Sequence, residues 1–299
     1  MTARRRIILT GATGLIGSEL SRRLCELGYE VIPFRSRHDG HGGFNHLTGF
    51  IDRETLEGAY AVIHLAGESI AQRWTEAAKD RIMASRRDGT RLLSEALAGL
   101  KHKPEVFISM SGINRYGLHR KEILDEASAV SAEGFLPEVT DAWENATLAA
   151  SEGGIRTVLL RTSLVLSATG GGLKKMLPAF RLGLGGPIGG GHQHMSWIGL
   201  PDLVELIHWA METPAIGGPL NAVAPQPVTQ AGFARTLGSV LHRPSFLPMP
   251  AWVLSLLFGQ MGRETILGDL AARPTVALDG GFRFAQPDLA SALRQAIGE

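Results

Sequence analysis

The sequence contains very little cysteine and almost no net charge. Cys25 is the only cysteine among 299 residues, which excludes an internal disulfide and a paired-cysteine zinc motif. This cysteine usage is typical of a reducing compartment, so we expect a cytoplasmic protein. The 30 Lys and Arg residues balance 29 Asp and Glu residues, which leaves a formal charge of +1. Because no net field would attract nucleic acid or an anionic membrane, we expect neither as a partner.

Long apolar runs are also lacking. The arginines at 4–6 and the apolar residues at 7–9 imitate the start of a signal peptide, but the apolar run ends after three positions at Thr10. A signal peptide needs an apolar region of about 7 to 15 residues. The longest apolar stretch elsewhere, residues 251–258, is far shorter than the roughly 20 residues of a membrane helix. We therefore expect neither an export signal nor a transmembrane segment.

The composition that remains is that of a folded globular protein. Hydrophobic residues make up 44% of the chain and charged residues 20%, which argues against disorder. Glycine is abundant, with 37 residues and no three-residue period. Such a glycine content indicates positions where the backbone needs a positive φ or a close approach to another group.

Short β-branched runs alternate with helical patterns over the first 160 residues, which predicts βαβ units and a parallel sheet. The predicted strands are 6–10, 31–34, 61–65, 106–110 and 155–161, with helices at 17–27, 76–100 and 135–150. A glycine-rich segment at 170–191 is followed by predicted helices at 201–211, 229–241 and 251–259 and a strand near 220–223. The predicted fold class is α/β. We expect a Rossmann-type doubly wound parallel sheet over 1–165, with 192–212 packing back on it, and a smaller, mostly helical substrate lobe over 166–299.

A glycine-rich turn lies between the first predicted strand and the first predicted helix. Its sequence is Thr10-Gly11-Ala12-Thr13-Gly14-Leu15-Ile16-Gly17. In a dinucleotide site the first glycine permits the tight turn, the second lets the backbone approach a pyrophosphate, and the third allows close helix–strand packing. The helix N-terminus offers free N–H groups to the phosphates. This motif in this position predicts dinucleotide binding, whereas the same letters elsewhere would indicate an ordinary turn.

The end of the second strand bears on the choice between NAD and NADP. An NAD site usually presents Asp or Glu there to bind the ribose 2′-hydroxyl. This chain has Arg35, Ser36 and Arg37, and Asp39 follows beyond the strand. Guanidinium and hydroxyl groups suit a 2′-phosphate, so we predict NADP. The alternative is that these arginines are solvated surface charges.

The third strand ends in small residues at the place where a doubly wound sheet receives its ligand. Leu65, Ala66 and Gly67 leave room for a cofactor, and Glu68 follows them. His64 stands among apolar neighbours, so we interpret it as a packed or hydrogen-bonded histidine of the strand.

These residues together resemble a known family. The glycine-rich turn, His64 to Glu68, Ser111 to Tyr116 and Gly117, and the segment 161–166 are similar to the extended short-chain dehydrogenase/reductase superfamily. A narrower resemblance, over nearly the whole chain, is to its epimerase-family oxidoreductases, often described as nucleoside-diphosphate-sugar epimerase-like. The segments that carry it are Arg73-Trp74-Thr75, Ser85-Arg86, Trp143-Glu144, Gly170-Gly171-Gly172, 180–189, Ser196-Trp197-Ile198, 221–225 and 241–244.

The resemblance implies an NADP-binding domain with a C-terminal substrate lobe. By position, the cofactor contacts of the family fall on Gly11 to Gly17, Arg35 and Ser36, Leu65 and Ala66, Arg86, and Val165. The strand-end arginine of the family falls on Ser36, with Arg35 and Arg37 on either side as substitutes. The family also implies a homodimer formed through the helices predicted at 76–100 and 135–150.

The acid–base pair of the superfamily is absent from this chain. Those enzymes use Tyr with Lys four residues later, and the lysine lowers the pKa of the phenol. Alignment of the helix predicted at 135–150 places Leu136 and Thr140 at these positions. Ser111 and Tyr116 are the remaining candidates for catalysis near the nicotinamide, although Tyr116 equally suits a pocket wall.

The resulting functional hypothesis is hydride transfer. We expect an NADP-dependent oxidoreductase or epimerase-like enzyme that acts on a small polar or sugar-nucleotide-like substrate. The alternative is an NADP(H)-binding redox sensor or partner-binding module without turnover, which the missing Tyr–Lys pair favours. The ten histidines have little carboxylate or cysteine support, so we expect no metal site.

Overall fold

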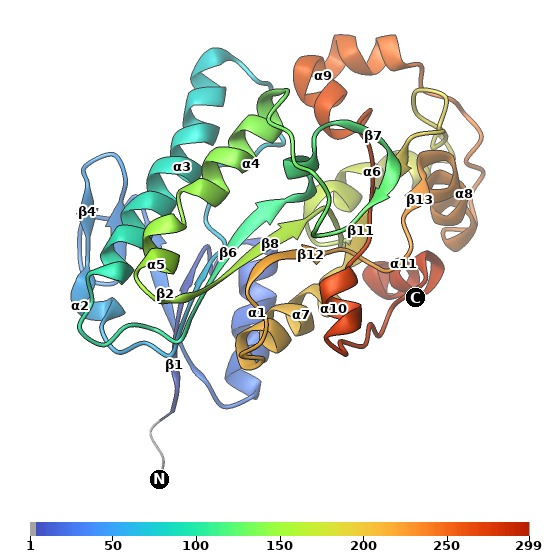
Figure 1. The fold of residues 1–299 in the computed structure, drawn as a ribbon. Helices are drawn as coiled ribbons and strands as arrows, with labels where there is room; N and C mark the ends of the chain where they lie inside the picture. The colour runs from blue at the N-terminus through green and yellow to red at the C-terminus, as the bar shows by residue number, and fades with distance from the viewer. Residues whose placement is uncertain (1–3, 299) are drawn as a thin grey trace.

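The computed structural model describes residues 4–298, which form a central sheet covered by helices (Figure 1). Eight strands lie in the order β12-β8-β6-β5-β1-β2-β3-β4, and every neighbouring pair is parallel except β3 and β4. This sheet confirms the predicted Rossmann-type fold. The strands are β1 (Arg6–Thr10), β2 (Glu30–Ser36), β3 (Gly43–Asn45), β4 (Phe50–Ile51), β5 (Ala61–His64), β6 (Val106–Gly112), β8 (Arg156–Thr162) and β12 (Gly218–Ala222).

Helices cover both faces of the sheet, which explains why its central strands are apolar on both sides. The α1 and α7 helices pack on one face, and α3 with α4 and α5 packs on the other (Figure 1). In β1, Ile7, Ile8 and Leu9 are all fully buried between these layers. The helices are α1 (Leu15–Glu26), α2 (Arg53–Leu56), α3 (Glu76–Ala98), α4 (Phe135–Asn145), α5 (Leu148–Glu152) and α7 (Leu200–Glu212).

The helix predicted at 135–150 is divided into α4 and α5. The Ser94 hydroxyl of α3 donates to the Thr147 carbonyl at 3.0 Å and accepts from the Ala150 N–H at 2.8 Å. A side chain of α3 therefore takes over backbone groups at the junction, and the chain can bend there while those groups stay satisfied.

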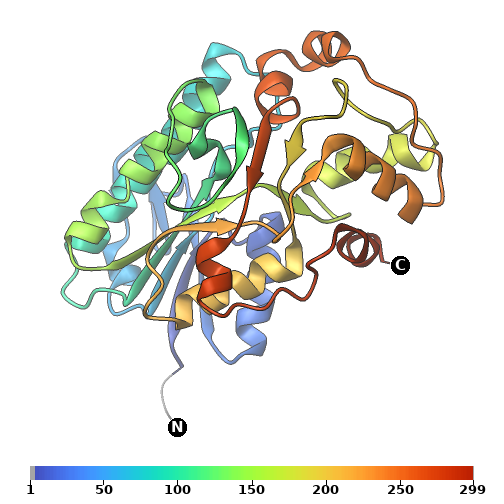
Figure 2. The same cartoon turned by 45° about the vertical axis from the view of Figure 1, so that its right-hand side comes forward.

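The C-terminal lobe lies beside the sheet (Figure 2). It has its own apolar core. Leu173, Leu177, Trp197, Phe233 and Leu237 are among its buried side chains. The remaining helices are α6 (Gly171–Arg181), α8 (Gln230–Val240), α9 (Ala251–Thr265), α10 (Thr275–Asp279) and α11 (Leu289–Ile297), of which α10 packs on β12 of the central sheet. Three strand pairs complete the chain: β9 (Leu164–Leu166) with β11 (Trp197–Gly199), β10 (His194–Met195) with β13 (Val228–Thr229), and β7 (His119–Leu124) with β14 (Asp269–Ala272).

Some C-terminal segments return to the first half of the chain. The β12 strand falls within the range assigned by sequence to the substrate lobe, yet it pairs with β8 at the edge of the central sheet. The α9 helix extends beyond its predicted end to Thr265 and is interrupted at Gly259, where φ is 58°.

Among residues 4–298, no helix has the length and apolar character required to span a membrane.

Candidate functional site

The strand order of the sheet reverses between β1 and β5, and the ends of these two strands form the candidate site. Later strands extend from β5 in one direction, while β2 lies on the other side of β1. Doubly wound sheets bind ligands at such a switch point, outside the carboxyl ends of the strands. The structure brings the two predicted segments together there, because a Cβ added to Gly11 would lie 2.9 Å from the Leu65 carbonyl carbon.

Backbone geometry explains the glycines of the turn after β1. Gly11 has a φ of +70°, and its carbonyl accepts from the Gly14 N–H at 3.0 Å. A Cβ added to Gly17 would lie 2.2 Å from the Gly11 carbonyl oxygen, so a larger residue would push the helix away from the turn. Thr13 is exposed in this turn, and Leu15 and Ile16 begin α1. The uncovered N–H groups at the start of α1 fit a pyrophosphate.

A buried hydrogen-bond network fixes the end of β5. The Thr10 hydroxyl oxygen lies 2.7 Å from His64 Nδ1 and accepts from the N–H groups of Leu65 and Ala66 at 3.1 Å each. His64 Nε2 lies 3.1 Å from the Thr90 hydroxyl, and burial lowers the pKa of His64 to about 3. His64 is therefore a neutral structural histidine, which confirms its interpretation from sequence.

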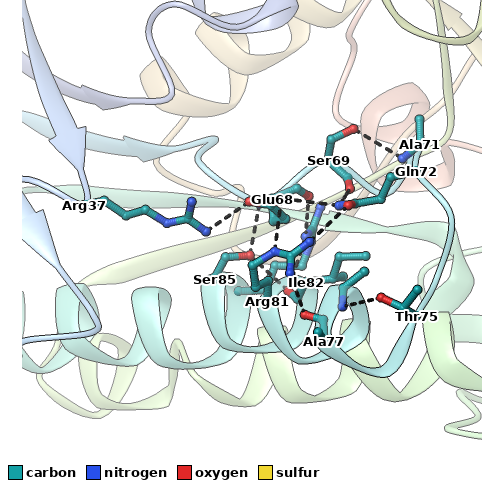
Figure 3. Close-up of polar contacts among 12 residues, drawn as sticks. Arg37, Glu68, Ser69, Ala71, Gln72, Thr75, Ala77, Arg81, Ile82 and Ser85 are labelled. Carbon is teal, nitrogen blue, oxygen red and sulfur yellow. Dashed lines mark hydrogen bonds and ion pairs between the residues drawn. The ribbon is translucent and has the colours of Figure 1, made fainter.

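A pocket of about 120 Å³ opens beside the switch point, at the ends of β2 and β5. Ser36 and Arg37 belong to its lining, whereas Arg35 is exposed outside it. Arg37 has a φ of 56°, and its guanidinium forms an ion pair with Glu68 across the pocket at 3.0 Å (Figure 3). The full lining comprises Ser36, Arg37, Phe44, His46, Ala66, Gly67, Glu68 and Ser85.

Side chains from α3 hold the Glu68 segment in place (Figure 3). The Ser85 hydroxyl accepts from the Glu68 N–H at 3.0 Å, and Arg86 Nη1 donates to the Glu68 carbonyl at 2.9 Å. The Glu68 carboxylate also lies 3.8 Å from Arg81 Nε and accepts from Gln72 at 3.3 Å. Arg86, predicted as a cofactor contact, thus supports the loop that forms the pocket wall.

The glycines at 170–172 lie on the cofactor side of the site. A Cβ added to Gly170 would lie 3.1 Å from a Leu15 side-chain carbon, and one on Gly172 would lie 2.7 Å from Leu164. The half-buried Val165 lies in the same region, on β9. These glycines let the start of α6 pack closely over the first turn of α1.

Ser111 and Tyr116 lie at the end of β6 and in the short 3₁₀ turn that follows, η1 (Ile113–Tyr116). The Ser111 hydroxyl donates to Glu144 at 2.8 Å, and the Tyr116 hydroxyl donates to Asn221 at 2.8 Å. Both side chains are buried, and burial raises the pKa of Tyr116. Their catalytic role stays a prediction, and in this structure both hydroxyls are engaged by buried partners.

Leu136 and Thr140, at the positions of the missing acid–base pair, are buried on α4. The Thr140 hydroxyl donates to the carbonyls of Leu136 and Pro137 at 3.0 Å each, so it is satisfied within its own helix. The Glu264 carboxylate of α9 accepts from the Leu136 N–H at 2.8 Å and the Phe135 N–H at 3.3 Å. This helix cap was not identified from the sequence, because Glu264 is about 130 residues away from α4.

Sequence reasoning also missed Phe44, His46 and Ser85 in the pocket. Phe44 lies in the three-residue strand β3 and His46 follows it, and so short a strand shows little apolar alternation. Ser85 was noticed only as part of a family segment. Across residues 4–298, no group of three His, Cys, Asp or Glu side chains is arranged to hold a metal ion.

The doubly wound sheet and the glycine turn at its switch point are those of a dinucleotide-binding protein of the oxidoreductase type. Comparison with known families gives the same class. Residues 7–223 match the NAD dependent epimerase/dehydratase family, and residues 249–296 match a domain of unknown function, DUF1731. The chain belongs to the NAD dependent epimerase/dehydratase family. This assignment confirms the resemblance identified from sequence.

Individual relatives match over nearly the full chain. The Epimerase family protein YfhF of Bacillus subtilis is 35% identical over 98% of both chains. The crystal structure of human epimerase family protein SDR39U1 with NADPH is 32% identical, has a TM-score of 0.89, and covers 98% of this chain and 99% of that one. The crystal structure of the nucleoside-diphosphate sugar epimerase from Corynebacterium glutamicum is 30% identical and has a TM-score of 0.79. The match covers 99% of this chain and 59% of that chain.

Proposed function

We propose that this chain is an NADP-dependent oxidoreductase or epimerase-like enzyme that acts on a small polar or sugar-nucleotide-like substrate. The observation that carries the proposal is the pocket beside the switch point, where Ser36 and Arg37 face the end of β5. The human relative solved with NADPH supports the same cofactor. When bound, the nicotinamide would supply or accept a hydride.

The donor set of the pocket fits a 2′-phosphate. Arg37 brings a guanidinium and Ser36 a hydroxyl, and the ion pair with Glu68 holds Arg37 over the pocket. The Ser85 hydroxyl instead donates to the Ile82 carbonyl at 3.0 Å and supports the Glu68 segment. A charge-assisted hydrogen bond contributes about 1.5–3 kcal/mol, or about 10 to 150-fold in affinity. Of the two arginines that flank Ser36, the geometry favours Arg37 as the phosphate ligand.

The residues around the nicotinamide end have positioning roles in this proposal. Tyr116 and Ser111 keep their hydroxyls on Asn221 and Glu144, so they shape the wall next to β6. The start of α6 closes the opposite side, where Lys175 donates to the Ala71 carbonyl at 3.1 Å.

A specific observation favours the second candidate, an NADP(H)-binding sensor or partner-binding module without turnover. Leu136 is buried and apolar, and the Thr140 hydroxyl is satisfied inside α4, so this helix offers no proton donor at the usual place. Turnover would then need a proton from the substrate or from another group of the site.

The predicted homodimer through α3 and α4 remains part of the proposal. Light scattering tests it, because a monomer at micromolar concentration would contradict it.

The test is a titration of the purified protein with NADPH and NADH. We expect a preference for NADPH of about tenfold or more, which Arg37→Ala abolishes and the matched Arg35→Ala retains. Equal binding of both dinucleotides would overturn the choice of NADP. A screen for NADPH oxidation with sugar nucleotides and small carbonyl compounds then separates the candidates, since turnover with any of them excludes a pure sensor.

A further inference from the structure

His46 lies on the wall between the dinucleotide pocket and α3. Its half-buried side chain lines the pocket together with Ser36 and Arg37. It also borders a second hollow over α3 that is formed with Gly49, Asp88, Arg91, Leu92 and Glu95. The imidazole therefore separates the pocket from the acidic and basic side chains of α3.

The backbone places His46 at the same end of the sheet as Arg37. In the parallel pair of β2 and β3, Arg35 is opposite Gly43 and Ser36 is opposite Phe44. The buried Phe44 ring stacks on Phe34 with a centroid distance of 5.7 Å, which fixes this register. Arg37 directly follows the last residue of β2, and His46 directly follows the last residue of β3. Both residues therefore lie just beyond the paired part of the two strands.

Further contacts hold the chain on each side of His46. The buried Asn45 donates to Asp39 at 3.0 Å and accepts from the Leu47 N–H at 3.1 Å. The first bond fixes the residue before His46, and the second joins the residues on either side of it. The imidazole is thus held at the pocket by a fixed backbone, which favours a binding role over that of a free surface residue.

The charges around His46 favour its neutral form in the absence of a ligand. Burial and the positive charge of Arg37 lower the pKa of His46, and Asp88 opposes this shift. Asp88 is itself paired with Arg87 at 2.9 Å and Arg91 at 3.2 Å. The charged groups that border His46 or its two hollows are Arg37 and Glu68 from the strand ends and Asp88, Arg91 and Glu95 from α3.

We propose that His46 is a ligand of the cofactor 2′-phosphate and binds it in the protonated form, beside Arg37 and Ser36. This inference rests on the proposed function. A neutral imidazole would leave the phosphate with fewer charge-assisted bonds, so binding recruits a proton from solvent to the ring. A dinucleotide without the 2′-phosphate has no group that recruits this proton. His46 thereby makes the preference for NADP(H) over NAD(H) depend on pH.

The test is to measure the affinity for NADPH and for NADH between pH 6.5 and pH 8.5. The 2′-phosphate has a second pKa of about 6 and is doubly charged over most of this range. We expect NADPH affinity to fall by up to about tenfold per pH unit as pH rises, the limit for uptake of one proton. NADH affinity stays level over this range. In His46→Gln, the pH dependence of NADPH affinity should be largely lost, so that the two cofactors respond to pH alike.

The matched control is His41→Gln, in the loop before β3, because the His41 side chain is 83% exposed and lies outside the pocket. This variant keeps the pH dependence of the original protein. A second readout is the NMR titration of the His46 ring, assigned by its loss in His46→Gln. NADP⁺ is expected to raise its pKa, and NAD⁺ to leave it unchanged.

The possible failures are distinguishable. If NADPH binds tightly but its pH dependence is absent, or is equal in His46→Gln, the role of His46 is overturned and the proposed function stands. If neither NADPH nor NADH binds, both proposals are overturned.

Discussion

Glu144 and Arg161 form a two-pronged ion pair in the interior, with both nitrogen–oxygen distances at 2.7 Å. Glu144 is 7% exposed and Arg161 is 3% exposed. The same carboxylate accepts from Ser111 at 2.8 Å and from Arg115 at 3.3 Å. The pair therefore connects α4 with the ends of β6 and β8.

We expect Glu144→Gln to destabilise the protein by about 3–5 kcal/mol, because it leaves the buried charge of Arg161 uncompensated. The measurement is the free energy of unfolding from urea titrations. Glu152→Gln, at an exposed position of α5, is the control and should change stability by no more than about 0.5 kcal/mol. Similar stabilities of the two variants would contradict the importance of the pair.

Tyr116→Phe separates a pocket-wall role from a catalytic one. The variant leaves the Asn221 amide oxygen without its buried donor, so we expect a loss of about 1–3 kcal/mol in unfolding free energy. NADPH affinity should stay unchanged. The half-buried Tyr29, whose hydroxyl lies 3.3 Å from His208, offers Tyr29→Phe as the control with a smaller loss. Unchanged stability together with loss of turnover would instead identify Tyr116 as a catalytic residue.

His64 predicts a pH dependence of stability. Its folded-state pKa is about 3, below the ordinary 6.5, so above pH 6.5 the ring is neutral in both states and folding carries no penalty. As pH falls below 6.5, the unfolded chain takes up a proton first and stability decreases, by at most about 1.4 kcal/mol per pH unit. We expect His64→Gln to flatten this slope between pH 4.5 and 6.5 in urea titrations, while the exposed His41→Gln retains it. Equal slopes for His64→Gln and the original protein would count against the neutral, buried histidine.

The central layers of the fold were predictable because their signals are local. The β1 strand, the glycine turn and α1 follow each other within about twenty residues, and each shows its own apolar pattern or backbone requirement. The partnership of β12 with β8 could not be read in this way. The two strands are joined through α6 and α7, and a short apolar strand carries no mark of which sheet it will enter.

The cofactor site shows the same division. The sequence placed arginines on both sides of Ser36 but could not choose between them, since the choice depends on the left-handed φ of Arg37. His46 and Glu264 act on residues from other strands and helices, so only the folded chain reveals them. The catalytic candidates Ser111 and Tyr116 were chosen from one short segment of the sequence, whereas their buried partners Glu144 and Asn221 come from distant segments.

The pairing of β7 with β14 can form only late in synthesis of the chain. His119 and Asp269 are opposite one another although 150 positions separate them. At about 5–20 residues per second, a ribosome needs about 8–30 s to cover that distance. For this interval β7 emerges without its neighbour, and Tyr116 lacks Leu270 and Ala272 of β14, which belong to the same apolar cluster. A nascent chain released before β14 would therefore leave this cluster incomplete, although synthesis began it much earlier.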